Sequence, residues 1–141
     1  MTGKTSPTVL ALLLSCGTAQ AAEWFSLGKS VAGDETFVDV SSVRVAGPMR
    51  RAWFKTIYVP HKTKESTGPD ANKWWHEGLQ RKAFNCAEET ARSEALTVYY
   101  EDGTNGSDPP AAYPTRWEPV VPETVLNTEM QFICAWKSKI K

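Results

Sequence analysis

The sequence is poor in the residue types that most enzyme and metal sites require. It has two histidines and three cysteines in 141 residues, and one of those cysteines is Cys16, close to the N-terminus. A zinc site needs about four closely spaced ligands. His61 and His76 lie 15 residues apart with no recognisable nucleophile beside them. We therefore predict no metal site, no cofactor and no catalytic residue, and expect a protein that is not an enzyme.

The sequence also lacks an excess of one charge and any long apolar run. Sixteen Lys and Arg residues face sixteen Asp and Glu residues, and Lys4 is the only charged residue in positions 1–22. Proteins that bind nucleic acid or anionic membranes usually carry a basic excess, so neither partner is expected. No apolar run approaches the roughly 20 residues that a membrane-spanning helix needs. There is no internal repeat or low-complexity run.

Residues 1–22 have the organisation of an export signal. A short apolar run, 9–14, follows Lys4, and Ala19-Gln20-Ala21 matches an A-x-A cleavage pattern. A second interpretation stays open, because residues 13–16 resemble a bacterial lipobox in which Cys16 becomes the lipidated first residue. We favour cleavage after position 21 or 22, whereas lipidation of Cys16 would tether the chain to a membrane. Residues 23–141 are predicted to form a single domain.

Cys86 and Cys134 are the two cysteines outside the leader. Export would place them in an oxidising compartment, where pairs of cysteines usually form disulfides. A pair of metal-binding or catalytic thiols is the alternative. A Cys86–Cys134 bond would close a loop of about 49 residues and contribute on the order of 4 kcal/mol in the chain-entropy model. We favour the disulfide, which would join the middle of the chain to its last element.

Short runs of aromatic and β-branched residues predict a β-sheet. The expected strands cover 23–29, 36–40, 49–59, 81–86 and 94–100, and the stretch 87–93 is either a connector or an extension of its neighbours. A single helical turn or bend is expected over 41–44. Turns are predicted at Gly33-Asp34, Gly47-Pro48 and Asn105-Gly106. The Gly-, Asp- and Pro-rich segment 101–116 should contain no regular helix and no central strand.

The C-terminal region predicts one helix. Pro122 followed by Glu123 is a favourable helix start. Apolar residues then recur at a spacing of three to four, at positions 125, 126, 130, 132, 133 and 136. Because a helix of about 14 residues is marginal in isolation, we expect its apolar stripe to pack on the sheet, with Cys134 beside it.

The long polar loop 60–72 and the two tryptophans after it are the best candidates for a binding surface. On a strand, Trp74 and Trp75 would point to opposite faces, so at most one should be buried in a one-sided core. The other is either a binding aromatic or packs beneath the loop. The nearby lysines, with Lys55, form either a weakly basic patch for acidic glycans or proteins or an ordinary solvated face. The candidate surface comprises Trp74, Trp75, His76, Lys62, Lys64 and Lys73.

Several motifs follow one another in a characteristic order: Phe37-Val38-Asp39-Val40-Ser41-Ser42-Val43-Arg44, the long strand 51–59, Phe84-Asn85-Cys86, Thr97-Val98-Tyr99-Tyr100, Trp117-x-Pro119-Val120-x-Pro122 and a helix ending near Cys134. This order resembles the surface-adhesin protein E-like family of Gram-negative envelope proteins. The resemblance covers residues 24–134. The chain departs from the family pattern at Asn85, where Asp is common, and in the length of its tryptophan-rich loop.

The resemblance implies an α+β fold, with an antiparallel sheet of about six strands and a C-terminal helix packed on one face and disulfide-bonded to it. It also implies an exported protein, in the periplasm or on the surface of a Gram-negative bacterium, that binds extracellular-matrix or serum proteins. The alternative is a periplasmic housekeeping protein, or one that binds a small ligand in an aromatic-lined groove between helix and sheet. Nothing in the sequence selects an oligomeric state.

Overall fold

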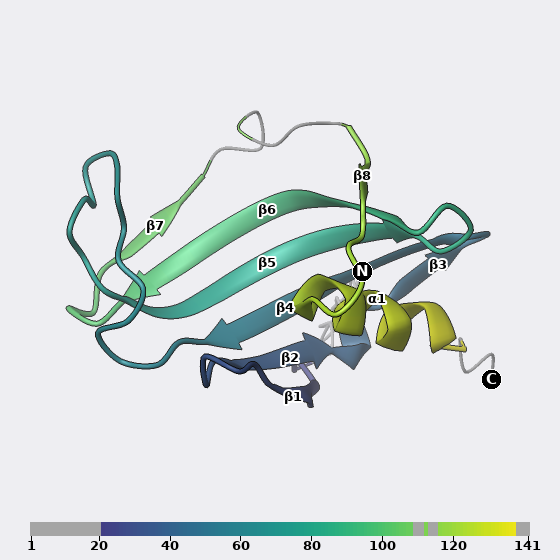
Figure 1. Ribbon diagram of the computed structural model, residues 1–141, viewed down its shortest axis with the longest axis horizontal. Helices are drawn as coiled ribbons and strands as arrows, with labels where there is room; N and C mark the ends of the chain where they lie inside the picture. Colours follow the sequence, from purple (N-terminus) through teal and green to yellow (C-terminus); the bar gives the residue numbers. More distant parts are fainter. Residues whose placement is uncertain (1–20, 109–111, 113–115, 138–141) are drawn as a thin grey trace, which may run out of the picture.

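The computed structural model describes residues 21–108, 112 and 116–137, and they form one antiparallel sheet with a helix across one face (Figure 1). The predicted export signal, including Cys16, lies almost entirely outside the described residues. The elements are β1 (Trp24–Lys29), β2 (Glu35–Asp39), the 3-10 turn η1 (Val40–Ser42), β3 (Arg44–Ala46), β4 (Met49–Ile57), β5 (Trp75–Asn85), β6 (Thr90–Tyr100), β7 (Asn105–Ser107), β8 (Glu118–Pro119) and α1 (Val125–Ala135). No helix in this described part is long and apolar enough to cross a membrane.

The predicted sheet is confirmed. Six strands follow one another in the order β1-β2-β4-β5-β6-β7, while β3 pairs with β4 and β8 pairs with β6. Every pairing is antiparallel. The segment 87–93, which the sequence left open, contributes both a turn and the start of β6. Asn85 Oδ1 accepts hydrogen bonds from the amides of Ala87 and Glu88, which closes that turn.

Two local predictions were wrong. Asn105-Gly106 is not a turn, because both residues belong to β7. The turn comes earlier, where Asp102 Oδ1 accepts hydrogen bonds from the amide and hydroxyl of Thr104 and Gly103 adopts a φ of 82°. The helix also begins later than Pro122 and Glu123 suggest. Glu123 has a φ of 62°, outside the helical range, and Thr124 caps the helix by accepting a hydrogen bond from the Asn127 amide.

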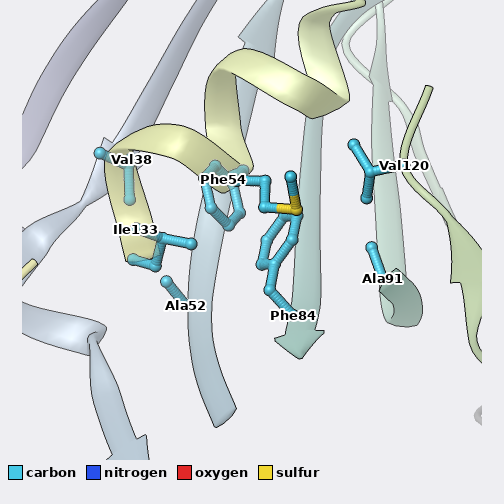
Figure 2. Close-up of a cluster of buried hydrophobic side chains, with 8 residues drawn as sticks. Val38, Ala52, Phe54, Phe84, Ala91, Val120 and Ile133 are labelled. Atoms are coloured by element: carbon cyan, nitrogen blue, oxygen red, sulfur yellow. The ribbon is translucent and has the colours of Figure 1, made fainter. Parts of the chain in front are cut away.

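The core lies between α1 and the sheet. Phe54 and Phe84 meet edge to face with centroids 5.8 Å apart, and Figure 2 shows them beneath the helix, with Ile133 next to Ala52. The buried cluster comprises Val38, Ala52, Phe54, Phe84, Ala91, Val120, Met130 and Ile133. Each large apolar side chain buried in this way stabilises the fold by roughly 1.5–3 kcal/mol. The predicted stripe is correct at Met130 and Ile133, whereas Val125 is 44% exposed.

The disulfide joins the central hairpin to the helix. Cys86 follows directly after β5 and bonds to Cys134 in the last turn of α1, with their Cα atoms 5.7 Å apart. This confirms the pairing expected from the two cysteines outside the leader. The bond fixes the C-terminal end of a helix that is too short to be stable alone.

Candidate binding surface

The connection between β4 and β5 is a long loop at one end of the sheet. Its two sides pair at an isolated β-bridge between Lys64 and Trp74. The Glu65 amide donates to the Lys73 carbonyl at 2.8 Å, and the Trp75 amide donates to the Thr63 carbonyl at 2.8 Å. Figure 1 shows this loop at the left, beyond the end of α1. Because its backbone is hydrogen-bonded, the loop holds its aromatic side chains in defined positions.

Trp74 is the centre of a small cluster of side chains on this loop. The His61 ring lies 5.6 Å from the Trp74 ring in an edge-to-face arrangement, and Lys64 Nζ lies 4.7 Å above the indole. Trp74 is half-buried, while Lys64 and His61 are exposed. A tryptophan held from two sides loses little side-chain entropy when a partner binds. The indole is therefore held in one orientation at the protein surface.

Glu101 fixes His61 in an unusual backbone conformation. His61 has a φ of 56°, in the left-handed region that L-residues seldom adopt. Glu101 Oε1 accepts a hydrogen bond from the His61 amide at 2.8 Å, and Oε2 lies 2.7 Å from Nδ1 of the His61 ring. The Glu101 amide in turn donates to the carbonyl of Trp74. Glu101 therefore joins the two ends of the loop, through its carboxylate at His61 and its backbone amide at Trp74.

Trp75 lies in different surroundings from Trp74. Its ring meets Tyr58 edge to face at 5.3 Å, and with Tyr100 it lines a hollow of about 460 Å³ under the loop. Glu65 and Asp70 also line this hollow. The Trp75 indole nitrogen is buried and has no hydrogen-bond partner among the described residues. Both tryptophans are half-buried, but only Trp74 carries exposed polar neighbours on its ring.

Each of the three lysines of the candidate surface has different contact partners. Lys73 Nζ lies 2.9 Å from Asp70 Oδ1 and 2.7 Å from Thr104 Oγ1, so it ties the loop to the turn before β7. The hydrogen bond to Asp70 is the main cause of a raised pKa at Lys73. Lys62 donates to the carbonyl of Ala32, and Lys64 lies over Trp74. These ammonium groups therefore connect the loop to different neighbouring segments and side chains.

The face of the sheet opposite α1 holds a second cluster that the sequence analysis missed. Glu94 on β6 is in contact with Arg51, Arg81 and Arg92, which come from three different strands. Arg51 lies on the same face of β4 as Trp53, and the alternation of cationic and aromatic residues on that strand was the available signal. The partners on β5 and β6 could not be recognised without the strand register.

A hollow also lies between α1 and the β6–β8 edge. It measures about 250 Å³ and is lined by Lys82, Ala91, Arg92, Ser93, Arg116, Glu118 and Leu126. An aromatic-lined groove between helix and sheet belonged to the alternative hypothesis of a small-ligand-binding protein. In the described residues, the aromatic-lined hollow lies instead at the loop end, beside Trp75 and Tyr100.

Comparison with known proteins places this fold in a family. The sequence profile described as surface-adhesin protein E matches residues 24–135, most of the chain. The chain belongs to the surface-adhesin protein E family. A second crystal form of Haemophilus influenzae protein E shares the fold, with a TM-score of 0.52 and 19% identity over 89% of this chain and 97% of that one. Another structure of the same protein gives a TM-score of 0.50 and 20% identity over 84% and 89%. Curated protein sequences contain no match.

Membership of the protein E family supports an adhesin-like binding module and an exported envelope or cell-surface location. The family and fold also favour a protein that is not an enzyme. His76 is exposed on β5, and the His61 side chain is 70% exposed and paired with Glu101. In the described residues, no group of three or more His, Cys, Asp or Glu side chains is arranged to hold a metal ion.

Proposed function

We propose that this protein is a non-enzymatic binding module of the bacterial envelope. It contacts extracellular-matrix or serum proteins through the loop-end surface around Trp74. The observation that carries the proposal is the Trp74 cluster, in which His61 and Lys64 hold a half-buried indole at the protein surface. Tryptophan is enriched at the energetic centres of protein interfaces. Family membership supports the adhesin-like class of function.

The test uses residues 23–141 with the disulfide formed. Purified matrix proteins and serum proteins are immobilised one at a time, and binding is measured by surface plasmon resonance beside a known adhesin. We expect saturable binding to at least one of them, weakened about tenfold or more by Trp74→Ala, because loss of a central tryptophan typically costs more than about 1–2 kcal/mol. Val121→Ala is the control, since Val121 is 61% exposed and precedes α1.

Two results would contradict the proposal. A chain that binds no matrix or serum protein, while the known adhesin does, would remove the adhesin-like part. Binding that survives Trp74→Ala unchanged would move the contact away from the loop end. Circular dichroism of each variant separates loss of contact from loss of fold.

A small-ligand function is the second candidate, and the hollow beside Trp75 and Tyr100 favours it. Its volume of about 460 Å³ is within the range of small-molecule sites. Glu65 and Asp70 line it, and because Asp70 is paired with Lys73, Glu65 supplies most of its acidic character. Such a site would suit a small cationic ligand. Native mass spectrometry of the protein purified from its own cells should then detect a bound molecule. Protein that is consistently empty would count against this function.

A further inference from the structure

The sheet face opposite α1 is open among the described residues. Ala52 and Phe54 of β4 point into the core beneath α1, so Arg51, Trp53 and Lys55 project from the other side of the same strand. α1, the only α-helix in the described part of the chain, lies over the first face (Figure 1). Arg51 is 51% exposed and Arg81 is 43% exposed.

Arginines from four neighbouring strands share this open face, and the one on β5 is Arg81, two residues before Ala83. Arg44 on β3 is opposite Arg51 on β4, Arg51 is opposite Ala83 on β5, and Ala83 is opposite Arg92 on β6. Residues directly opposite one another in an antiparallel pair point to the same face. Ala83 is only 2% exposed, although it lies on the face without a helix. With strands about 4.8 Å apart, the row spans roughly 14 Å.

One carboxylate organises these arginines without neutralising them. Glu94 Oε2 lies 2.7 Å from Arg51 Nε and 3.2 Å from Arg81 Nε, while Oε1 lies 3.2 Å from Arg92 Nη2. Burial alone would raise the pKa of Glu94, but the three guanidinium groups lower it, so the carboxylate stays charged. Four arginine charges, with Arg44 included, therefore face one carboxylate charge, a difference of three.

Aromatic rings lie beside the guanidinium groups. Arg92 Cζ is 4.7 Å above the Trp117 ring, and Arg81 Cζ is 5.7 Å from the Trp53 ring. A hollow of about 240 Å³ adjoins the row and is lined by Arg44, Ala46, Met49, Arg50, Arg51 and Ala83. Guanidinium groups bind carboxylate and sulfate oxygens in a two-pronged geometry, and stacking on a ring keeps them oriented.

We propose that this arginine face binds an anionic polysaccharide that carries sulfate or carboxylate groups. A row of cations across four strands suits an extended chain with repeated charges better than a single small anion. The half-buried rings of Trp53 and Trp117 provide apolar surface for sugar rings. Toward the other end of β4, Asp39 lies opposite Trp24, where it is buried and accepts hydrogen bonds from the Glu23 and Ser41 amides. Glu35 and Glu77 lie opposite Ile57, six residues from Arg51. The positive surplus is therefore confined to one end of the face and is separate from the loop-end surface.

The experiment measures binding of a heparin oligosaccharide to residues 23–141 by isothermal titration calorimetry, with uncharged dextran as the negative control. We expect saturable binding that weakens as ionic strength rises. Arg51→Gln combined with Arg81→Gln should weaken binding about tenfold or more, because charge-assisted hydrogen bonds are lost. Lys29→Gln combined with Lys137→Gln removes the same formal charge from exposed positions on β1 and after α1, and should change affinity less than threefold.

Glu94→Gln provides a test in the opposite direction. This variant removes the one carboxylate from the cluster, so heparin should bind more tightly than to the unaltered chain, whereas a damaged fold would bind less. No binding of heparin at low ionic strength would overturn the proposal. So would equal losses in the two double variants. Tighter binding of poly-glutamate than of heparin would indicate that the face binds an acidic protein, and would overturn the proposal of a polysaccharide ligand. Thermal melts confirm that each variant is folded.

Discussion

Lys82 Nζ on β5 lies 2.6 Å from Glu129 Oε2 on α1, in a contact that crosses the interface between helix and sheet. Glu129 is fully buried, and Lys82 also lies 5.4 Å from the ring centroid of Phe54. An acidic side chain is expensive to bury unless an opposite charge and hydrogen bonds compensate. The pair therefore ties the position of α1 on the sheet to one particular strand residue.

Removal of only one partner should be costly. Lys82→Met would leave the buried Glu129 carboxylate without its cation, and we expect a loss on the order of 3 kcal/mol in the free energy of unfolding. Lys82→Met combined with Glu129→Met should recover most of that loss, because two apolar side chains of similar volume need no pairing. Urea denaturation of the three variants checks this. Additive losses in the double variant would show that the pair is not coupled.

The cost of Lys82→Met should also depend on pH. Burial raises the pKa of Glu129, and the Lys82 charge opposes that rise without cancelling it. The stability contribution of a raised carboxyl pKa is complete below the ordinary glutamate pKa and is lost as pH rises through the folded-state pKa. Without Lys82 the rise is larger, so the variant should be nearest to the original chain in acid and fall behind toward neutral pH.

The control for this pH series is Lys55→Met. Lys55 lies on the other face, over the rings of Trp24 and Phe37, so its contacts do not involve Glu129. Its cost in the free energy of unfolding should vary little over the same pH range. A Lys82→Met cost that is equally flat would contradict the assigned role of Glu129.

The pattern of residue types along the chain predicted those parts of the fold that depend on residues close together in the sequence. The apolar spacing in the C-terminal helix placed Met130 and Ile133 on the stripe that packs on the sheet, and export together with two cysteines indicated the Cys86–Cys134 bond. The sequence did not reveal the role of Glu129, because a charged residue beside Met130 reads as the solvent side of a helix. The burial of Glu129 can be explained only once Lys82 is known to lie opposite it on the sheet.

The candidate sites show the same limit. Trp74 and Trp75 were recognised because they are adjacent in the chain, and adjacency on a strand implies different faces. The arginine row depends on the register among β3, β4, β5 and β6, and a shift of one residue would send each strand's side chains to the other face. β3 itself has three residues, with no pattern long enough to predict it.

Loss of the disulfide should destabilise the domain strongly. Cys134→Ser frees α1 from Cys86, and the chain-entropy model gives a loss on the order of 4 kcal/mol. Thermal unfolding should show a clearly lower midpoint, and non-reducing peptide mass spectrometry of the original chain should detect the linked peptides. Cys86→Ser combined with Cys134→Ser controls for the new free thiol and should match the single variant. Two free thiols in exported protein would contradict the disulfide.

Glu101 should keep the loop between β4 and β5 in its ordered conformation, while the rest of the fold does not depend on it. Glu101→Ala removes the acceptor for the His61 amide, so hydrogen exchange at that amide should speed up about tenfold, as for the loss of one hydrogen bond of about 1–1.5 kcal/mol. Glu101→Gln keeps one oxygen acceptor and serves as the matched control. Binding through Trp74 should weaken with Glu101→Ala and be largely retained with Glu101→Gln. Unchanged exchange in the alanine variant would mean that Glu101 does not hold the loop.

Protease treatment of intact cells should distinguish a surface location from a periplasmic one. Lys62 and Lys64 are exposed on the loop, so trypsin has candidate cleavage sites there. Purified residues 23–141 must first be shown to be cut under the same conditions, because a hydrogen-bonded loop can resist proteolysis. If the protein acts as an adhesin, full-length protein on cells should be degraded while a periplasmic marker stays intact. Protection of both proteins would place the domain inside the outer membrane and favour a small ligand at the hollow beside Trp75.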